Sequence, residues 1–115
     1  MKKFCLTLDL KNDSQLIEEY KIHHQKVWPE IIQSIHDSGI VDMEIYLLGN
    51  RLCMVIEADD VFTFEGKSEA DLNNEKVQEW EKLMWDYQQV LPLAKPGEKW
   101  MLMEKIFELN EPQSL

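Results

Sequence analysis

The sequence has few of the residues that mark a cofactor site, a metal site or a covalent nucleophile. Only four of its 115 residues are glycine and two are cysteine. It contains no glycine-rich phosphate loop, no Cys-x-x-Cys, no His-x-x-x-His and no Gly-x-Ser-x-Gly. Each of these motifs supplies a definite chemistry, so their absence argues against phosphate-loop nucleotide binding, paired zinc ligands and serine hydrolysis. We therefore expect no cofactor and no metal.

Basic side chains are also scarce. The chain has 12 lysines and arginines against 22 aspartates and glutamates, which gives a formal net charge of −10. Clusters of lysine and arginine bind phosphate-rich partners, so we expect neither nucleic acid nor an anionic membrane as a partner. No apolar run approaches the roughly 18 residues that span a bilayer. The composition favours a neutral or cationic small molecule instead.

The amino terminus and the cysteines indicate a reducing compartment. Residues 1–10 begin with a basic pair, but they lack a long apolar stretch and a cleavage site, and Asp9 interrupts them, unlike a signal peptide. Two cysteines, Cys5 and Cys53, are too few for a disulfide framework. We expect both to be buried and reduced, and the protein to be cytoplasmic.

Hydrophobic periodicity divides the chain into strands and helices. Apolar and polar residues alternate in four segments, so strands are expected at 3–10, 41–48, 51–58 and 99–109. Helical spacing elsewhere predicts helices from about 14 to 28, from 29 to a glycine at 39, and from 75 to 89. Gly49 and Asn50 are a two-residue hairpin signal, and we expect 59–74 to be a loop with a short helix.

The predicted order of elements is βαββαβ, which is typical of the ferredoxin-like fold. We expect an α+β domain over residues 1–110 with a four-stranded antiparallel sheet, helices on one face, and a frayed tail at 111–115. The other face keeps apolar side chains, above all in the last strand, and such a face usually marks an interface. We therefore expect a homodimer that packs sheet against sheet as a dimeric α/β barrel.

Three aromatic side chains recur every four residues before a proline: Tyr20, His24 and Trp28, followed by Pro29. On a helix this spacing places a phenol, an imidazole and an indole on one face. Their flat apolar faces suit the C–H surface of a sugar-sized ligand, and an imidazole exchanges protons near neutral pH. Aromatic residues at this spacing are also common in helical cores, so packing without function is the alternative.

Of the three histidines, His24 is the candidate for acid–base chemistry. His23 is adjacent, so the two side chains diverge by about 100° on a helix and cannot hold one metal from the same face. His23 is expected to face solvent. His36 lies near the carboxyl end of the second helical piece, where a protonated imidazole interacts favourably with the helix dipole. Only His24 shares a face with Tyr20 and Trp28.

Residues 19–30, with the pattern Glu-Tyr-x-x-x-His-x-x-x-Trp-Pro-Glu, resemble a specific segment of the L-rhamnose mutarotase family. Residues 45–47, 78–84 and 104–107 fit the same family, so the resemblance covers essentially the whole chain. It implies the dimeric ferredoxin-like fold and the interconversion of the α and β anomers of 6-deoxyhexoses without a cofactor. One group protonates the ring oxygen while another accepts the anomeric proton, and one positioned acid–base group contributes about 10²–10⁴-fold.

The resemblance also implies roles for individual residues. The proton-donating histidine of the family falls on His24, its sugar-contacting tyrosine on Tyr20, and one aromatic of its pocket on Trp80. Trp28 fits equally well as a sugar-binding surface and as a core residue. His24 is thus the expected catalytic residue, with Tyr20, Trp28 and Trp80 as expected substrate-binding residues.

Two positions of the implied sugar pocket differ from the family pattern. Met43 stands where the family has a tyrosine, and Glu81 stands where it has a second tryptophan. Both are expected to bind substrate and to influence which sugar fits. The sugar itself stays open, with L-rhamnose as the first expected substrate and L-fucose as a close second.

Two other functions remain open from the sequence. Dimeric monooxygenases, cofactor-free or haem-handling, share the expected fold, and this fold analogy is the only support for that activity. A non-catalytic ligand-binding or assembly module would use Tyr20, His24 and Trp28 for packing alone. In that second case, replacing His24 would change stability and would not touch any exchange of anomers.

Overall fold

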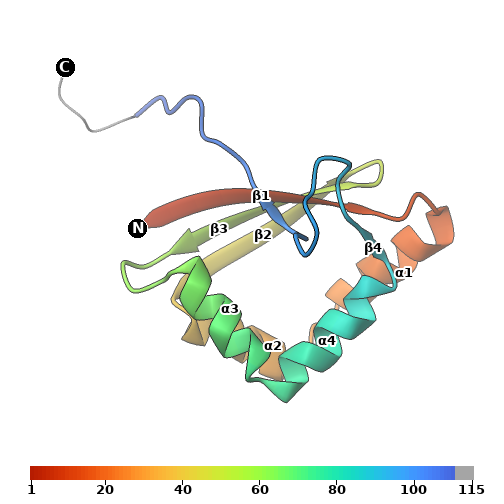
Figure 1. Ribbon diagram of the computed structural model, residues 1–115, viewed down its shortest axis with the longest axis horizontal. Helices are drawn as coiled ribbons and strands as arrows, with labels where there is room; N and C mark the ends of the chain where they lie inside the picture. Colours follow the sequence, from red (N-terminus) through yellow and green to blue (C-terminus); the bar gives the residue numbers. More distant parts are fainter. Residues whose placement is uncertain (111–115) are drawn as a thin grey trace.

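A computed structural model describes residues 1–110 of the chain (Figure 1). The expected tail at 111–115 lies outside the described residues. In chain order the elements are β1 (Lys2–Leu10), α1 (Ser14–His24), α2 (Pro29–Asp37), β2 (Ile40–Leu48), β3 (Arg51–Ala58), α3 (Phe64–Leu72), α4 (Glu75–Trp85), β4 (Gln88–Gln89) and β5 (Met101–Leu102). Across this described part, no helix has the length and apolar character that crossing a membrane requires.

The strands form one antiparallel sheet, which confirms the predicted α+β class. Its order is β2-β3-β1-β4, and β5 also pairs with β1. The first strand therefore lies between the third and the last two, which is the order that the ferredoxin-like arrangement predicts. The β2–β3 hairpin turns at Gly49, whose φ of 62° lies in the left-handed region that glycine adopts without a steric cost.

The helices begin and end where the sequence supplies a cap or a glycine. The Asp13 carboxylate accepts hydrogen bonds of 3.0 Å from two backbone N–H groups in the first turn of α1. Thr63 and Asn74 cap α3 and α4 in the same way. Pro29 opens α2, where its missing N–H costs nothing. Gly39 follows α2 with a φ of 101°, as predicted for the residue after a helix.

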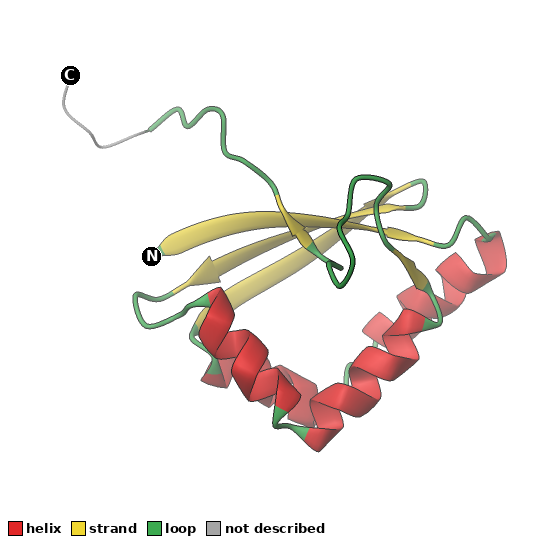
Figure 2. Cartoon of the chain, viewed as in Figure 1, coloured by secondary structure: helices red, strands yellow, loops and turns green. Residues whose placement is uncertain are grey.

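The four helices lie on one side of the sheet (Figure 2). α3 and α4 form a V whose apex, at residues 73–74, is far from the sheet and whose open end faces it (Figure 1). The core is divided into two clusters of buried side chains. The first consists of Leu10, Tyr20, Ile31, Leu52, Val77, Trp80, Met84 and Tyr87. The second consists of Leu6, Ile40, Ile56, Ala58 and Phe62.

The prediction of a long last strand was wrong. A strand was expected over 99–109, but β5 comprises only Met101–Leu102, and the sheet has five strands because β4 also joins it. The chain then leaves the sheet (Figure 1), and Ile106 and Phe107 are 89% and 75% exposed. Alternation of apolar residues predicts a strand only if another strand bonds to it, and these residues have no such neighbour within the described chain.

Two helix boundaries also differ from the prediction. The first helix ends at His24, so Tyr20 and His24 share a helical face while Trp28 lies beyond it, at the cap of α2. The ψ of Trp28 is 136°, because a residue before proline is pushed to an extended conformation. α4 ends at Trp85, earlier than expected, and β4 then pairs with β1. The short helix expected within 59–74 is α3.

The sheet face without helices carries an ion pair and two thiols. The Arg51 guanidinium donates to both carboxylate oxygens of Asp9, at 2.7 and 3.1 Å. Cys5 and Cys53 lie on this face as half-buried free thiols, with their Sγ atoms 3.0 Å apart. The hydrogen bond with Cys53, followed by burial, raises the pKa of Cys5 to about 11, so Cys5 keeps its proton at neutral pH. The reduced state of the pair stays a prediction.

Candidate active site

A cavity lies between the sheet and the helices, where the two core clusters meet. Its volume is about 1080 Å³, slightly above the roughly 300–1,000 Å³ that is usual for small-molecule sites. Five of the six expected site residues line it: Tyr20, His24, Met43, Trp80 and Glu81. The sixth, Trp28, is not among the lining residues. Two helices and one strand therefore bring five predicted side chains to one cavity.

Among residues 1–110, His24 has a hydrogen-bond partner at one ring nitrogen, Nδ1, and none at the other, Nε2. Its Nδ1 lies 2.9 Å from the carbonyl oxygen of Tyr20, one turn earlier on α1. A carbonyl oxygen only accepts, so Nδ1 carries the hydrogen and Nε2 of the neutral ring carries the lone pair. Burial lowers the pKa of His24 below its ordinary value; the bond to Tyr20 opposes this shift, and the charge of His23 adds to it. The imidazole is therefore a neutral base near pH 7.

The phenol of Tyr20 lies directly beside this imidazole. The two ring centroids are 4.3 Å apart, with 35° between the ring planes. Burial raises the pKa of Tyr20, and a hydrogen bond from Gln88 partly opposes this shift. In that bond, Nε2 of Gln88 donates to the phenolic oxygen at 3.5 Å. Tyr20 therefore keeps its proton near neutral pH and offers an O–H donor in the cavity.

Trp80 forms the aromatic wall of the cavity. Its ring meets His24 edge to face, with centroids 5.7 Å apart. On another side it meets Trp28 in the same manner, at 5.1 Å. Lys76 Nζ lies 5.8 Å from the centroid of the Trp28 ring. Trp28 thus packs against Trp80 and does not line the cavity. Its expected contact with the substrate stays a prediction.

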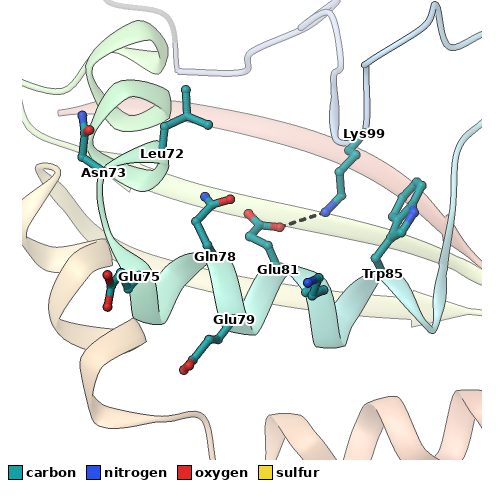
Figure 3. A pocket seen from close by; sticks show the side chains of 9 residues that line it. Leu72, Asn73, Glu75, Gln78, Glu79, Glu81, Trp85 and Lys99 are labelled. Carbon is teal, nitrogen blue, oxygen red and sulfur yellow. Dashed lines mark hydrogen bonds and ion pairs between the residues drawn. The ribbon is translucent and has the colours of Figure 1, made fainter.

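The rim of the cavity carries a pair of opposite charges. A groove along α4 (Figure 3) shares Leu72, Gln78, Glu81 and Lys99 with the cavity. Lys99 Nζ lies 2.8 Å from a Glu81 carboxylate oxygen and 5.1 Å from the Trp85 ring centroid. Both charged side chains are partly exposed, so this ion pair contributes at most about 1 kcal/mol to stability. Its main consequence is to fix the position of Glu81 at the mouth of the cavity.

His23 is not the solvent-facing residue that the sequence predicted. Its Nε2 lies 3.2 Å from the Tyr87 hydroxyl oxygen, and that hydroxyl donates to Glu19 at 3.2 Å. Because the Tyr87 hydrogen is directed to Glu19, the phenolic oxygen accepts from His23. The side chains of His23 and His24 diverge, as predicted for adjacent helical residues. His23, however, packs on Tyr87 instead of facing water. His36 is exposed in the last turn of α2, as expected.

The groups around the imidazole suit proton transfer and the binding of hydroxyl groups. Within residues 1–110, no group of three or more His, Cys, Asp and Glu side chains is placed to hold a metal ion. The polar lining of the cavity includes the phenol of Tyr20, the carboxamide of Gln88 and the carboxylate of Glu81. Together they provide both donors and acceptors for a polyhydroxylated ligand, and Trp80 provides a flat apolar surface.

The family model for L-rhamnose mutarotase matches residues 3–109. The chain belongs to this family. This match confirms the resemblance found in residues 19–30. The matched range includes the residues that line the cavity and the strands of the sheet that supports it.

Two relatives and one solved structure support the assignment of the chain to the L-rhamnose mutarotase family. An L-fucose mutarotase from Xanthomonas campestris pv. campestris is 38% identical over 117 residues, which cover 100% of this chain and 94% of the relative. An L-rhamnose mutarotase from Formosa agariphila is 29% identical over 96 residues, covering 79% and 86%. A crystal structure of an L-rhamnose mutarotase from Formosa agariphila has a TM-score of 0.70 at 24% identity, covering 95% and 99%, and shows the same fold.

Gln88 and Lys99 are among the cavity residues of this L-rhamnose mutarotase family member that the sequence did not indicate. Gln88 lies in a two-residue strand, for which no periodic signal exists. Lys99 lies in the segment that was expected to be a regular strand, and its ion pair with Glu81 joins residues 18 positions apart. Glu81 stands where the family pattern has a second tryptophan, and this difference was the available signal for a charged partner nearby.

Proposed function

We propose that the chain interconverts the α and β anomers of a 6-deoxy-L-hexose, with L-fucose as the first substrate and L-rhamnose as the second. The observation that carries this proposal is the imidazole of His24, bonded through Nδ1 to the Tyr20 carbonyl and stacked beside the buried phenol of Tyr20 in one cavity. The sequence alone placed L-rhamnose first. The higher identity to the L-fucose mutarotase, 38% against 29%, supports the reverse order.

In the proposed reaction, His24 moves one proton between two oxygens of the sugar. Nε2 accepts the proton of the anomeric hydroxyl and delivers it to the ring oxygen as the bond between C1 and that oxygen breaks. The open aldehyde turns about its C1–C2 bond. On closure, Nε2 takes the proton back from the same oxygen and returns it to the new anomeric oxygen, so that the imidazole ends neutral. Tyr20 donates a hydrogen bond that orients the sugar and need not ionise.

The walls of the cavity fit the two sides of such a substrate. Trp80 offers a flat surface to ring C–H groups, and Met43 on β2 is an apolar wall suited to the methyl group of a 6-deoxy sugar. Glu81, held by Lys99, accepts hydrogen bonds from hydroxyl groups near the mouth. Glu81 and Met43 are the two positions that differ from the family pattern. We therefore propose that these two side chains determine whether L-fucose or L-rhamnose binds better.

Saturation-transfer NMR tests the proposed activity without coupling enzymes. The α anomeric proton of L-fucose is saturated, and the loss of β signal gives the exchange rate with and without protein. The expected result is accelerated exchange for L-fucose, with L-rhamnose slower. Absence of acceleration for both sugars and for other 6-deoxyhexoses would overturn the proposal and favour a non-catalytic binding module. No observation favours a monooxygenase beyond the shared fold.

We further propose that the protein is a cytoplasmic homodimer joined through the sheet face without helices. The segment 104–110 supports a dimer, because it leaves the body of the molecule (Figure 1) and exposes Ile106, Phe107 and Leu109. The choice of the sheet face rests on the absence of helices there in the described chain (Figure 2). A partner that covers these side chains removes a large apolar surface from water. Light scattering should give twice the chain mass of 13.7 kDa; a mass of 13.7 kDa at micromolar concentration would contradict the dimer.

A further inference from the structure

Gln88 is a buried polar residue with only one end of its side chain satisfied. Its side chain is 4% exposed. Nε2 donates to the Tyr20 hydroxyl oxygen at 3.5 Å, whereas Oε1 is fully buried and has no hydrogen-bond partner among the described residues. Buried polar atoms in folded proteins are almost always paired, so an unpaired carbonyl oxygen requires a specific explanation. A ligand that brings a donor is one such explanation.

The fold fixes this carboxamide against the cavity. Gln88 pairs with Leu10 in the antiparallel β4–β1 ladder, which sets the direction of its side chain. Gln89, the next residue of the strand, points to the opposite side and is exposed. Gln88 lines the same cavity as Tyr20 and His24. The Gln88 carboxamide is therefore beside a group that would bind the sugar, the phenol of Tyr20.

We infer that Gln88 is a substrate-binding residue whose Oε1 accepts a hydrogen bond from a ring hydroxyl of the sugar. This inference rests on the proposed function and adds a specificity-determining contact to it. The same side chain holds the Tyr20 hydroxyl through Nε2, so one carboxamide connects the substrate to the phenol beside His24. A sugar that lacks the matching hydroxyl leaves Oε1 unpaired in the complex, so the site disfavours the deoxygenated analogue by about the value of one hydrogen bond.

The test compares Gln88→Met with the matched control Gln89→Met on L-fucose and on its 2-deoxy, 3-deoxy and 4-deoxy analogues. We expect Gln88→Met to lower kcat/KM for L-fucose by about 2- to 10-fold, mainly through KM, and Gln89→Met to leave it unchanged. For one analogue, the wild-type kcat/KM should be lower than for L-fucose by a similar factor. The kcat/KM for that analogue should not fall further in Gln88→Met, as a double-mutant cycle requires for two groups in contact.

Two results would overturn the assignment of Gln88. The first is a Gln88→Met variant whose kcat/KM falls by the same factor for L-fucose and for all three deoxy analogues. Gln88 would then contact none of the tested hydroxyl groups and would act only through Tyr20. The second is full activity of Gln88→Met on L-fucose. A wild-type protein that exchanges no 6-deoxyhexose would instead overturn the proposed function itself.

A measurement on the wild type covers the case in which Gln88→Met does not fold. The side-chain ¹⁵NH₂ resonances of Gln88 are followed during titration with L-fucose and with each analogue. A shift with L-fucose that one analogue fails to produce supports the contact. Identical shifts with all four sugars, or none with a sugar that demonstrably binds, would contradict it.

Discussion

Replacing each of the two adjacent histidines by asparagine separates chemistry from packing. His24 lines the cavity and offers a free Nε2, whereas His23 lies outside it and donates to Tyr87. In His24→Asn the amide still has a donor for the Tyr20 carbonyl, but it exchanges no proton at neutral pH. We therefore expect anomer exchange to fall by about two to four orders of magnitude, the usual contribution of one positioned acid–base group.

The same substitution at His23 should have the opposite profile. It removes one part-buried hydrogen bond to Tyr87, worth about 0.5–1.5 kcal/mol. For a domain of this size that corresponds to a Tm lower by about 2–6 °C. Exchange at temperatures well below the Tm should stay close to the wild-type rate, because His23 does not line the cavity.

The assay is saturation-transfer NMR on L-fucose and L-rhamnose, combined with thermal unfolding followed by circular dichroism for each variant. Equal losses of exchange in His23→Asn and His24→Asn would refute the reasoning. So would a His24→Asn variant that loses stability and keeps its exchange rate. In either case the aromatic face of α1 would be packing, and the proton transfer would belong to another group.

Burial lowers the pKa of His24, and a general base must be unprotonated. The exchange rate should therefore stay level as the pH falls to about 6.5, the ordinary histidine pKa, and decline only below it. A decline that begins above pH 7 would contradict this. Tyr20→Phe removes one hydrogen bond and keeps the ring, so it should slow exchange much less than His24→Asn, by an amount equivalent to about 0.5–1.5 kcal/mol in a comparison of kcat/KM. Mass spectrometry of the unreduced protein should give the mass with Cys5 and Cys53 as thiols, and a loss of two hydrogens would show a disulfide. Gly39→Ala should destabilise the protein by more than about 1 kcal/mol in urea unfolding, because φ is 101° and an added Cβ would lie 2.6 Å from a side-chain oxygen of Asp59; wild-type stability would mean that the loop adapts.

The parts of the fold that the sequence predicted correctly are those in which one residue pattern has one structural solution. Period-two alternation over 3–10 and 51–58 places one apolar side of β1 and β3 in the core, and they pair in register along eight positions. Gly49 and Asn50 specify the hairpin for the same reason. Residues 99–109 alternate as clearly, but only Met101–Leu102 pair with β1, and the chain then leaves the sheet (Figure 1).

The candidate site was predictable where it follows from one helix and not where it follows from tertiary pairing. Tyr20 and His24 are four residues apart on α1, so their common face could be inferred from spacing alone. Trp28 could not be placed, because the helix ends before it. Gln88 depends on where α4 stops and on the register between β4 and β1, which no local pattern specifies. The partner of Glu81 likewise depends on the path of the connector.

The state of the His24 ring is the most direct test of the central claim, that Nε2 is the proton acceptor. Long-range ¹H–¹⁵N correlation spectra at neutral pH distinguish the two neutral tautomers from the imidazolium by the shifts of both ring nitrogens. The bond from Nδ1 to the Tyr20 carbonyl predicts a neutral ring with hydrogen on Nδ1 and none on Nε2. A ring protonated at Nε2, or at both nitrogens at pH 7, would contradict the claim.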